Sequence, residues 1–227
     1  MKKTVIILGI LGVTILGFLF FKRKFYDPKH RFENSKVEVE QLASEGEIKN
    51  GDLIFQTSLS RQSKAIQLAT KSKYSHCGII YKDGNNFFVF EAVQPVKLTS
   101  LDKWIARGED GKYVMKRLKN ADKILTSSVL KKMKLIGDRF RGKNYDLTFE
   151  WSDDKIYCSE LIWKIYKRAT GIEIGKLEKL SDFDLTNQLV KKTMKERYGN
   201  KIPTEEIVIS PAAIFQSELL KTVKSNY

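Results

Sequence analysis

Two mainly hydrophobic runs in the middle of the chain have the composition of β-strands, and KYVMKRL at 112–118 alternates hydrophobic and polar residues as a strand does. HCGIIYK at 76–82 and FFVFEAV at 87–93 are rich in β-branched and aromatic residues. The Asp83-Gly84-Asn85-Asn86 segment between them predicts a hairpin turn. We expect further strands at 51–56, 112–118 and 205–210.

Other segments repeat their apolar residues at the spacing of an α-helix. Helices are predicted at 61–72, 99–107, 121–140, 156–169 and 182–198. Ser210 followed by Pro211 is a start signal for one more helix. Hairpin strands with separate helices, without regular βαβ alternation, predict an α+β fold with an antiparallel sheet. A Gly-rich phosphate loop is missing, which disfavours dinucleotide and triphosphate chemistry.

The N-terminus carries a different pattern, an uncharged apolar run from Thr4 to Phe21 between Lys2-Lys3 and Lys22-Arg23-Lys24. A helix of this length spans about 27 Å, close to the hydrocarbon thickness of a bilayer. Because the run has no small-residue cleavage site at its end, we expect an uncleaved membrane anchor at 1–26 rather than a cleaved signal peptide. The charged segment 27–50 predicts a stalk with a short helix at 36–45, and 51–227 is then the folded domain.

Charge and cysteine count narrow the possible partners. Lys and Arg outnumber Asp and Glu 41 to 27, a net charge of +14, of which five charges lie in residues 1–26. The remaining positive charge fits a domain that lies beside an anionic cell envelope. Because the sequence has no signature of a nucleic-acid-binding fold, we expect no nucleic-acid partner. A single anchor with a short tail favours an extracytoplasmic domain, although the flanking bases favour the opposite orientation. Two cysteines exclude a disulfide scaffold and a zinc site of three or four thiolates, and we expect no metal.

The candidate nucleophile is Cys158, within SDDKIYCSELIWKIY at the start of a predicted helix. There the helix dipole and free backbone N–H groups stabilise a thiolate, and one N–H could serve as an oxyanion donor. A cysteine so placed is also commonly a small buried hydrophobic residue, and this alternative stays open on the residues alone. The chain has two histidines: His30 in the stalk, and His76 at the start of a strand, which is the candidate base.

Strand geometry separates the other candidates. Neighbouring side chains on a strand point to opposite faces, so we expect Cys77 to face the core, away from His76 and without a disulfide to Cys158. Pairing across the hairpin places residues near 89–93 opposite 76–80. Glu91, a lone carboxylate in an apolar strand, is therefore predicted to reach the His76 ring and hold its tautomer. The alternative is a solvated glutamate on an edge strand.

The order of these blocks resembles a known family. GDLIFQ, YSHCGIIY, FEAV, GKNYDLTFEWSDDKIYCSELIWKIY and VISPAAIFQSELL, with His before Cys, are similar to the circularly permuted papain-like hydrolases of the NlpC superfamily, the YiiX/YaeF group. The likeness runs from about Gly51 to Leu220 and implies a papain-like sheet packed with helices. It also implies Cys158 as nucleophile, His76 as base and Glu91 as the residue that orients the base.

The resemblance implies a thioacyl mechanism on an amide or ester, without a metal or organic cofactor. Tyr157, Tyr145 and Asp146 are the predicted substrate-binding residues, with packing and turn formation as the alternative; Asp52 is read as structural. The first functional hypothesis is an amidase or peptidase acting on cell-wall peptides, anchored through residues 4–21. The second keeps the same site for a lipid acyl substrate, as a hydrolase or acyltransferase. The third is a non-enzymatic basic module that binds an anionic surface.

Overall fold

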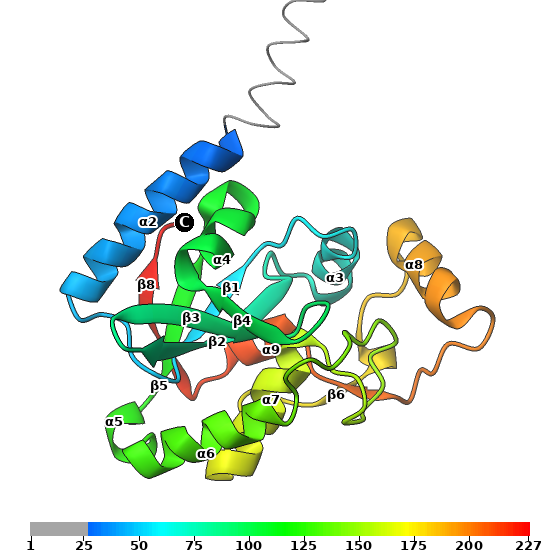
Figure 1. Ribbon diagram of the computed structural model, residues 1–227. Coiled ribbons are helices and arrows are strands. Elements are labelled where there is room, and N and C mark those ends of the chain that lie inside the picture. Colours follow the sequence, from blue (N-terminus) through cyan, green and yellow to red (C-terminus); the bar gives the residue numbers. More distant parts are fainter. Residues whose placement is uncertain (1–26) are drawn as a thin grey trace, which may run out of the picture.

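The computed structural model describes residues 27–227 and is built on a six-stranded antiparallel sheet. The strand order is β4-β3-β2-β1-β5-β8 (Figure 1). The bounds are β1 Leu53–Gln56, β2 His76–Asp83, β3 Asn86–Glu91, β4 Lys97–Ser100, β5 Val114–Leu118 and β8 Leu220–Ser225. A short pair, β6 (Glu178–Lys179) with β7 (Ile207–Val208), lies apart from this sheet. The predicted α+β fold with an antiparallel sheet is confirmed.

Each face of the sheet has its own hydrophobic core, as the alternation of strand side chains requires. Phe55, Cys77 and Ile79 face the core formed with α6 (Ser127–Asp138), α7 (Cys158–Thr170) and α9 (Pro211–Gln216). Ile54, Ile80 and Val89 face the other core, formed with α2 (Asp27–Ser44) and α4 (Leu101–Arg107). Figure 1 shows these two groups of helices on opposite sides of the sheet.

Most of the predicted elements are present, with adjusted boundaries. The β2–β3 hairpin closes with Asp83 opposite Asn86, and α3 (Ser63–Thr70) lies where a helix was expected. The helix predicted at 121–140 is two helices, α5 (Ala121–Ile124) and α6, because the Thr126 side chain caps a new start by accepting from the Val129 N–H. The helix expected at 182–198 is α8 (Gln188–Tyr198), preceded by the 3₁₀ turn η3 (Leu180–Asp182); a second such turn is η2 (Glu109–Gly111).

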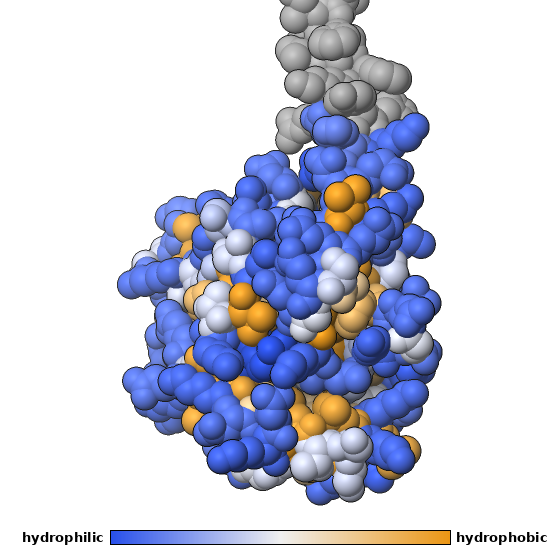
Figure 2. All heavy atoms as spheres, turned by 90° about the vertical axis from the view of Figure 1, so that its left-hand side faces the viewer, coloured by the Kyte–Doolittle hydropathy of each residue, from blue (hydrophilic) through white to orange (hydrophobic). Residues whose placement is uncertain are grey.

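Residues 27–44 differ from the predicted stalk because they form one long helix that packs on the domain. Leu42 of α2 is buried in the core beneath α4, and Ser35 is also buried. The Tyr113 hydroxyl donates a hydrogen bond to Glu38 Oε1 at 2.6 Å. Among the apolar residues of α2, only Leu42 is fully buried, with Val39 and Ala43 partly buried against the same core, so the sequence shows little helical periodicity. The face that carries α2 is mostly hydrophilic, with small separate hydrophobic patches (Figure 2).

The expected fold included a membrane-spanning helix at 4–21, and this part of the expectation is corrected. That run lies outside the described residues, and within 27–227 no helix combines the length and hydrophobicity needed to cross a bilayer. The fold that the structure describes is therefore an α+β domain without a membrane helix.

Candidate active site

Cys158 is the first residue of α7, and its position is set by the way this helix begins. Tyr157 is the N-cap, and its backbone N–H donates to the Glu160 carboxylate at 3.4 Å, as in a capping box. The Tyr157 hydroxyl accepts from the Ile209 N–H at 3.1 Å, which fixes the cap residue from its other end. The Cys158 sulfur therefore lies beside the free N–H groups of a first helical turn, while its side chain is almost fully buried.

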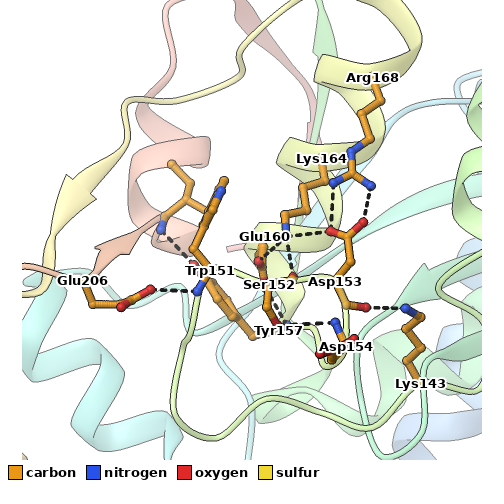
Figure 3. A network of polar contacts seen from close by, with 11 residues as sticks. Lys143, Trp151, Ser152, Asp153, Asp154, Tyr157, Glu160, Lys164, Arg168 and Glu206 are labelled. Atoms are coloured by element: carbon orange, nitrogen blue, oxygen red, sulfur yellow. Dashed lines mark hydrogen bonds and ion pairs between the residues drawn. The ribbon is translucent and has the colours of Figure 1, made fainter. Parts of the chain in front are cut away.

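A charged network fastens the preceding connector to α7 (Figure 3). Lys164 Nζ lies 2.7 Å from Glu160 Oε1 and 2.9 Å from Asp153 Oδ1, and Arg168 also binds the Asp153 carboxylate with two nitrogens. Burial raises the pKa of Glu160 to about 8, although Lys164 opposes this rise. The Trp151 N–H donates to Glu206 at 2.8 Å. The network holds the segment before Cys158 against α7, so the backbone of Cys158 is fixed.

His76 and Glu91 lie at the same end of the β2–β3 hairpin. The His76 Nε2 atom is 2.6 Å from Glu91 Oε2, and both side chains are buried. The His76 ring also stacks on Trp104, with 5.8 Å between ring centroids. Because Glu91 is fully buried, the alternative of a solvated edge glutamate is wrong.

Glu91 accepts hydrogen bonds from four side chains. Besides His76, Oε2 accepts from Trp104 Nε1 at 2.9 Å and Arg107 Nη2 at 2.5 Å, and Oε1 accepts from Thr99 Oγ1 at 2.6 Å. Burial acts to raise the pKa of Glu91, but His76 and Arg107 outweigh it and bring the pKa to about 2. The residue is therefore a fixed carboxylate. The sequence reasoning missed the three additional donors, and the one available signal was Arg107 at the end of a predicted helix beside this hairpin.

The Cys158 thiol and the His76 ring interact, and each favours the charged form of the other. Burial pulls the pKa of His76 down, yet the hydrogen bonds to Cys158 and Glu91 raise it to about 9. The hydrogen bond from the Cys77 side chain lowers the pKa of Cys158 against the effect of burial, and the bond and charge of His76 lower it further. The pair is thus poised as thiolate and imidazolium near neutral pH, the state that a cysteine nucleophile requires.

Cys77 lies closer to the site than we expected. It does face the core on the α7 side, and it is fully buried there. However, Cys158 begins a helix on that same side, so the Cys77 side chain and backbone N–H both act to lower the pKa of Cys158. Burial and the neighbouring Cys158 raise the pKa of Cys77, which remains a neutral donor. Both thiols are free, so the chain has no Cys77–Cys158 disulfide in this structure.

Two cavities lie at the site, one lined by Cys158 and the other by His76. The first, which we call the Cys158 pocket, has a volume of about 90 Å³ and an almost wholly apolar lining. It is lined by Cys158, Tyr157, Phe149, Leu180, Val190 and Met194, among others. The second, the His76 cleft, has a volume of about 570 Å³ and is lined by His76, Ser58, Gln94, Arg107 and Leu147, among others.

The three predicted substrate-binding residues occupy different positions. Tyr145 and Gln62 line both cavities, and Gln62 Nε2 donates to the Tyr145 hydroxyl at 2.9 Å. Tyr157 lines the Cys158 pocket. Asp146 lines neither of these two cavities, because its Oδ1 atom accepts from the N–H and hydroxyl of Thr148 two residues on. Asp146 therefore forms a turn, the alternative considered for it.

Comparison with known proteins agrees with this geometry. A family model described as "Permuted papain-like amidase enzyme, YaeF/YiiX, C92 family" matches residues 47–224. The chain belongs to this family. It is 48% identical over 177 residues to the uncharacterized protein YiiX of Escherichia coli K12, covering 78% of this chain and 86% of that protein. A solved YiiX structure from Escherichia coli O157:H7 is 49% identical, with a TM-score of 0.75 over 79% of this chain and 98% of the other.

That solved structure is described as a metalloprotein. Within residues 27–227 of the present chain, no three His, Cys, Asp or Glu side chains lie together in a way that could hold a metal ion.

Proposed function

We propose that the chain is a cysteine amidase in which Cys158 is the nucleophile and His76 the general base and acid. One observation carries the proposal: the His76 ring interacts with the Cys158 thiol and with the buried Glu91 carboxylate, which lies 2.6 Å from Nε2. This is the nucleophile–base–orienting-group arrangement of cysteine hydrolases. The match to a permuted papain-like amidase family supports it.

The steps follow from the charges. The Cys158 thiolate attacks the amide carbonyl carbon, and the tetrahedral oxyanion forms beside the first turn of α7, where backbone N–H groups can donate. The His76 imidazolium then gives its proton to the leaving amine as the C–N bond breaks, which leaves a thioester on Cys158. A water molecule next gives a proton to neutral His76 and attacks the thioester. The acid product leaves, and the thiolate–imidazolium pair is restored.

The two cavities indicate how the substrate is oriented at the site. The acyl group becomes attached to Cys158, so it occupies the Cys158 pocket. The leaving amine receives its proton from His76, so it occupies the His76 cleft. We therefore expect a substrate with a compact, mainly apolar acyl side and a larger amine side. Cell-wall peptides are one source of such amide bonds.

A second candidate uses the same residues on a lipid acyl ester or amide, as an acyl hydrolase or acyltransferase. The apolar lining of the Cys158 pocket favours it, because such a lining contributes apolar burial for an acyl chain. In an acyl transfer, an alcohol or amine would replace water in the second step.

The test is to incubate the purified full-length chain with peptidoglycan peptides and, separately, with phospholipid vesicles, and to look for an adduct on Cys158 by mass spectrometry. A peptidyl adduct supports the amidase, and a fatty-acyl adduct supports the lipid candidate. Cys158→Ala should remove both the adduct and turnover. Turnover that is unchanged in Cys158→Ala would refute both, and salt-dependent binding to anionic vesicles unaffected by this change would favour a non-enzymatic surface-binding module.

A further inference from the structure

Among the described residues that line the Cys158 pocket, Arg197 of α8 is the one Lys, Arg, Asp or Glu. Its neighbours in this lining are Phe149, Val190 and Met194, and the pocket also touches the nucleophile. An arginine in an apolar pocket loses part of its hydration, and burial lowers the pKa of Arg197. A partly desolvated cation beside the acyl position calls for an explanation.

Arg197 is held in place by neutral groups rather than by a direct ion pair. One guanidinium nitrogen donates to Gln62 Oε1 at 2.7 Å, and the guanidinium carbon lies 5.1 Å from the centre of the Phe149 ring. Within residues 27–227 it makes no ion pair, although Asp146 and Glu196 act on it through space. A guanidinium has five N–H donors, and Gln62 uses one. The Arg197 side chain is thus held in one orientation, and its other N–H groups remain free to donate to a ligand.

Arg107, on the other side of the pair, provides a contrast. It lines the His76 cleft, but its guanidinium lies 2.5 Å from the Glu91 carboxylate, which takes up its charge. Arg197 has no such carboxylate. Of the two arginines that flank the Cys158–His76 pair, Arg197 is the one available to bind an anion.

We propose that Arg197 is a specificity-determining residue that binds an anionic group, a carboxylate or a phosphate, on the acyl portion of the substrate. The placement of the acyl portion rests on the proposed function. The preferred acyl group is then a short apolar stem that ends in an anion, because the stem contacts the apolar lining while its terminal group meets the guanidinium. Bidentate geometry suits both carboxylate and phosphate, and Gln62 fixes the plane of the guanidinium.

The test compares substrates that differ only in charge. The full-length chain is assayed with the 4-nitroanilides of glutaric acid (carboxylate end), of glutaramic acid (neutral carboxamide end) and of a phosphonate-ended acid of equal length. We expect the wild type to prefer an anionic substrate over the carboxamide by 10-fold or more in kcat/KM. Arg197→Gln should lower kcat/KM for the anionic substrate by 10- to 100-fold and leave the carboxamide within threefold. Arg197→Lys should recover part of the preference.

The matched control is Lys195→Gln, which removes one exposed positive charge from the same helix outside the pocket lining. It should leave the anion preference unchanged. An equal preference in wild type and Arg197→Gln, or an equal loss in Lys195→Gln, would overturn the proposal. The ratio of kcat/KM between the carboxylate and phosphonate substrates identifies which anion Arg197 prefers.

A binding measurement separates this proposal from the proposed amidase. Glutarate and inorganic phosphate are titrated calorimetrically into wild type and Arg197→Gln. If none of the anilides is hydrolysed, the amidase fails, while anion binding lost in Arg197→Gln still supports the role of Arg197. Binding that is absent, or equal in both proteins, overturns that role.

Discussion

Replacing Glu91 with glutamine should lower the pKa of His76 and so narrow the pH range of the ion pair at the site. The change keeps the side-chain shape but removes the charge that faces Nε2 at 2.6 Å. Two unit charges about 4 Å apart interact by about 4 kcal/mol at an effective dielectric constant of about 20. The net rise of the His76 pKa from 6.5 to about 9 is shared between Cys158 and Glu91 and opposed by burial. We therefore expect Glu91→Gln to lower the pKa of His76 by about 1–2 units, or about 1.4–2.7 kcal/mol.

Two histidines in the whole chain make this prediction measurable by NMR. The ring Cε1–H resonances of His30 and His76 are followed from pH 5 to 10 in wild type and Glu91→Gln, with His30→Gln used for assignment. The alkaline limb of kcat/KM, which reports the imidazolium that protonates the leaving amine, should move down by the same amount. His76→Gln serves as the reference for complete loss of this limb. A His76 resonance that titrates at the same pH in both proteins would refute the assignment of Glu91 as the group that stabilises the imidazolium.

Three further predictions follow from the same contacts. Cys77→Ala should raise the pKa of the Cys158 thiol, because the variant removes the Cys77 side-chain donor and keeps the backbone N–H. The pH dependence of iodoacetamide labelling at Cys158 measures this pKa, and an unchanged labelling profile would contradict the contact between the two thiols. Lys164→Met should destabilise the fold by about 3–5 kcal/mol at pH 9, where Glu160 is ionised and would be left buried without its cation, and by less at pH 6, where Glu160 is protonated. The double variant Lys164→Met/Glu160→Gln should recover most of the loss at pH 9 in urea unfolding. For Glu91 the folded pKa of about 2 lies below the ordinary 4.5, so its ionisation stabilises the fold above pH 4.5 by about 3 kcal/mol and this contribution is lost as the pH falls towards 2. Unfolding measured from pH 6 to 2 should therefore show a shallower acid loss in Glu91→Gln than in wild type.

The sequence was informative about this site where a local pattern sets the geometry. The Asp83-Gly84-Asn85-Asn86 turn fixes the hairpin register, and the register alone brings Glu91 within reach of His76. Likewise, the helix start after Ser152-Asp153-Asp154 places Cys158 at an N-terminus. In both cases a few neighbouring residues decide the outcome.

What the sequence could not predict depends on contacts between distant segments. Trp104 and Arg107 reach Glu91 only because α4 packs on the opposite face of the sheet from α7. The short edge strands β4 and β8 have mixed polar composition, and their pairing with β3 and β5 defines them. Cys77 contacts Cys158 because the α7 start lies over the sheet face that Cys77 occupies, a relation with no local signal.

The packing of α2 on α4 has a practical consequence for any shortened form of the protein. The family match begins at residue 47, and a fragment cut there would omit α2 and expose the side of α4 that it covers. The same short helix supplies Trp104 and Arg107, which both donate hydrogen bonds to the Glu91 carboxylate. A fragment that keeps Cys158, His76 and Glu91 but lacks α2 would therefore lose part of the packing that holds α4 in place.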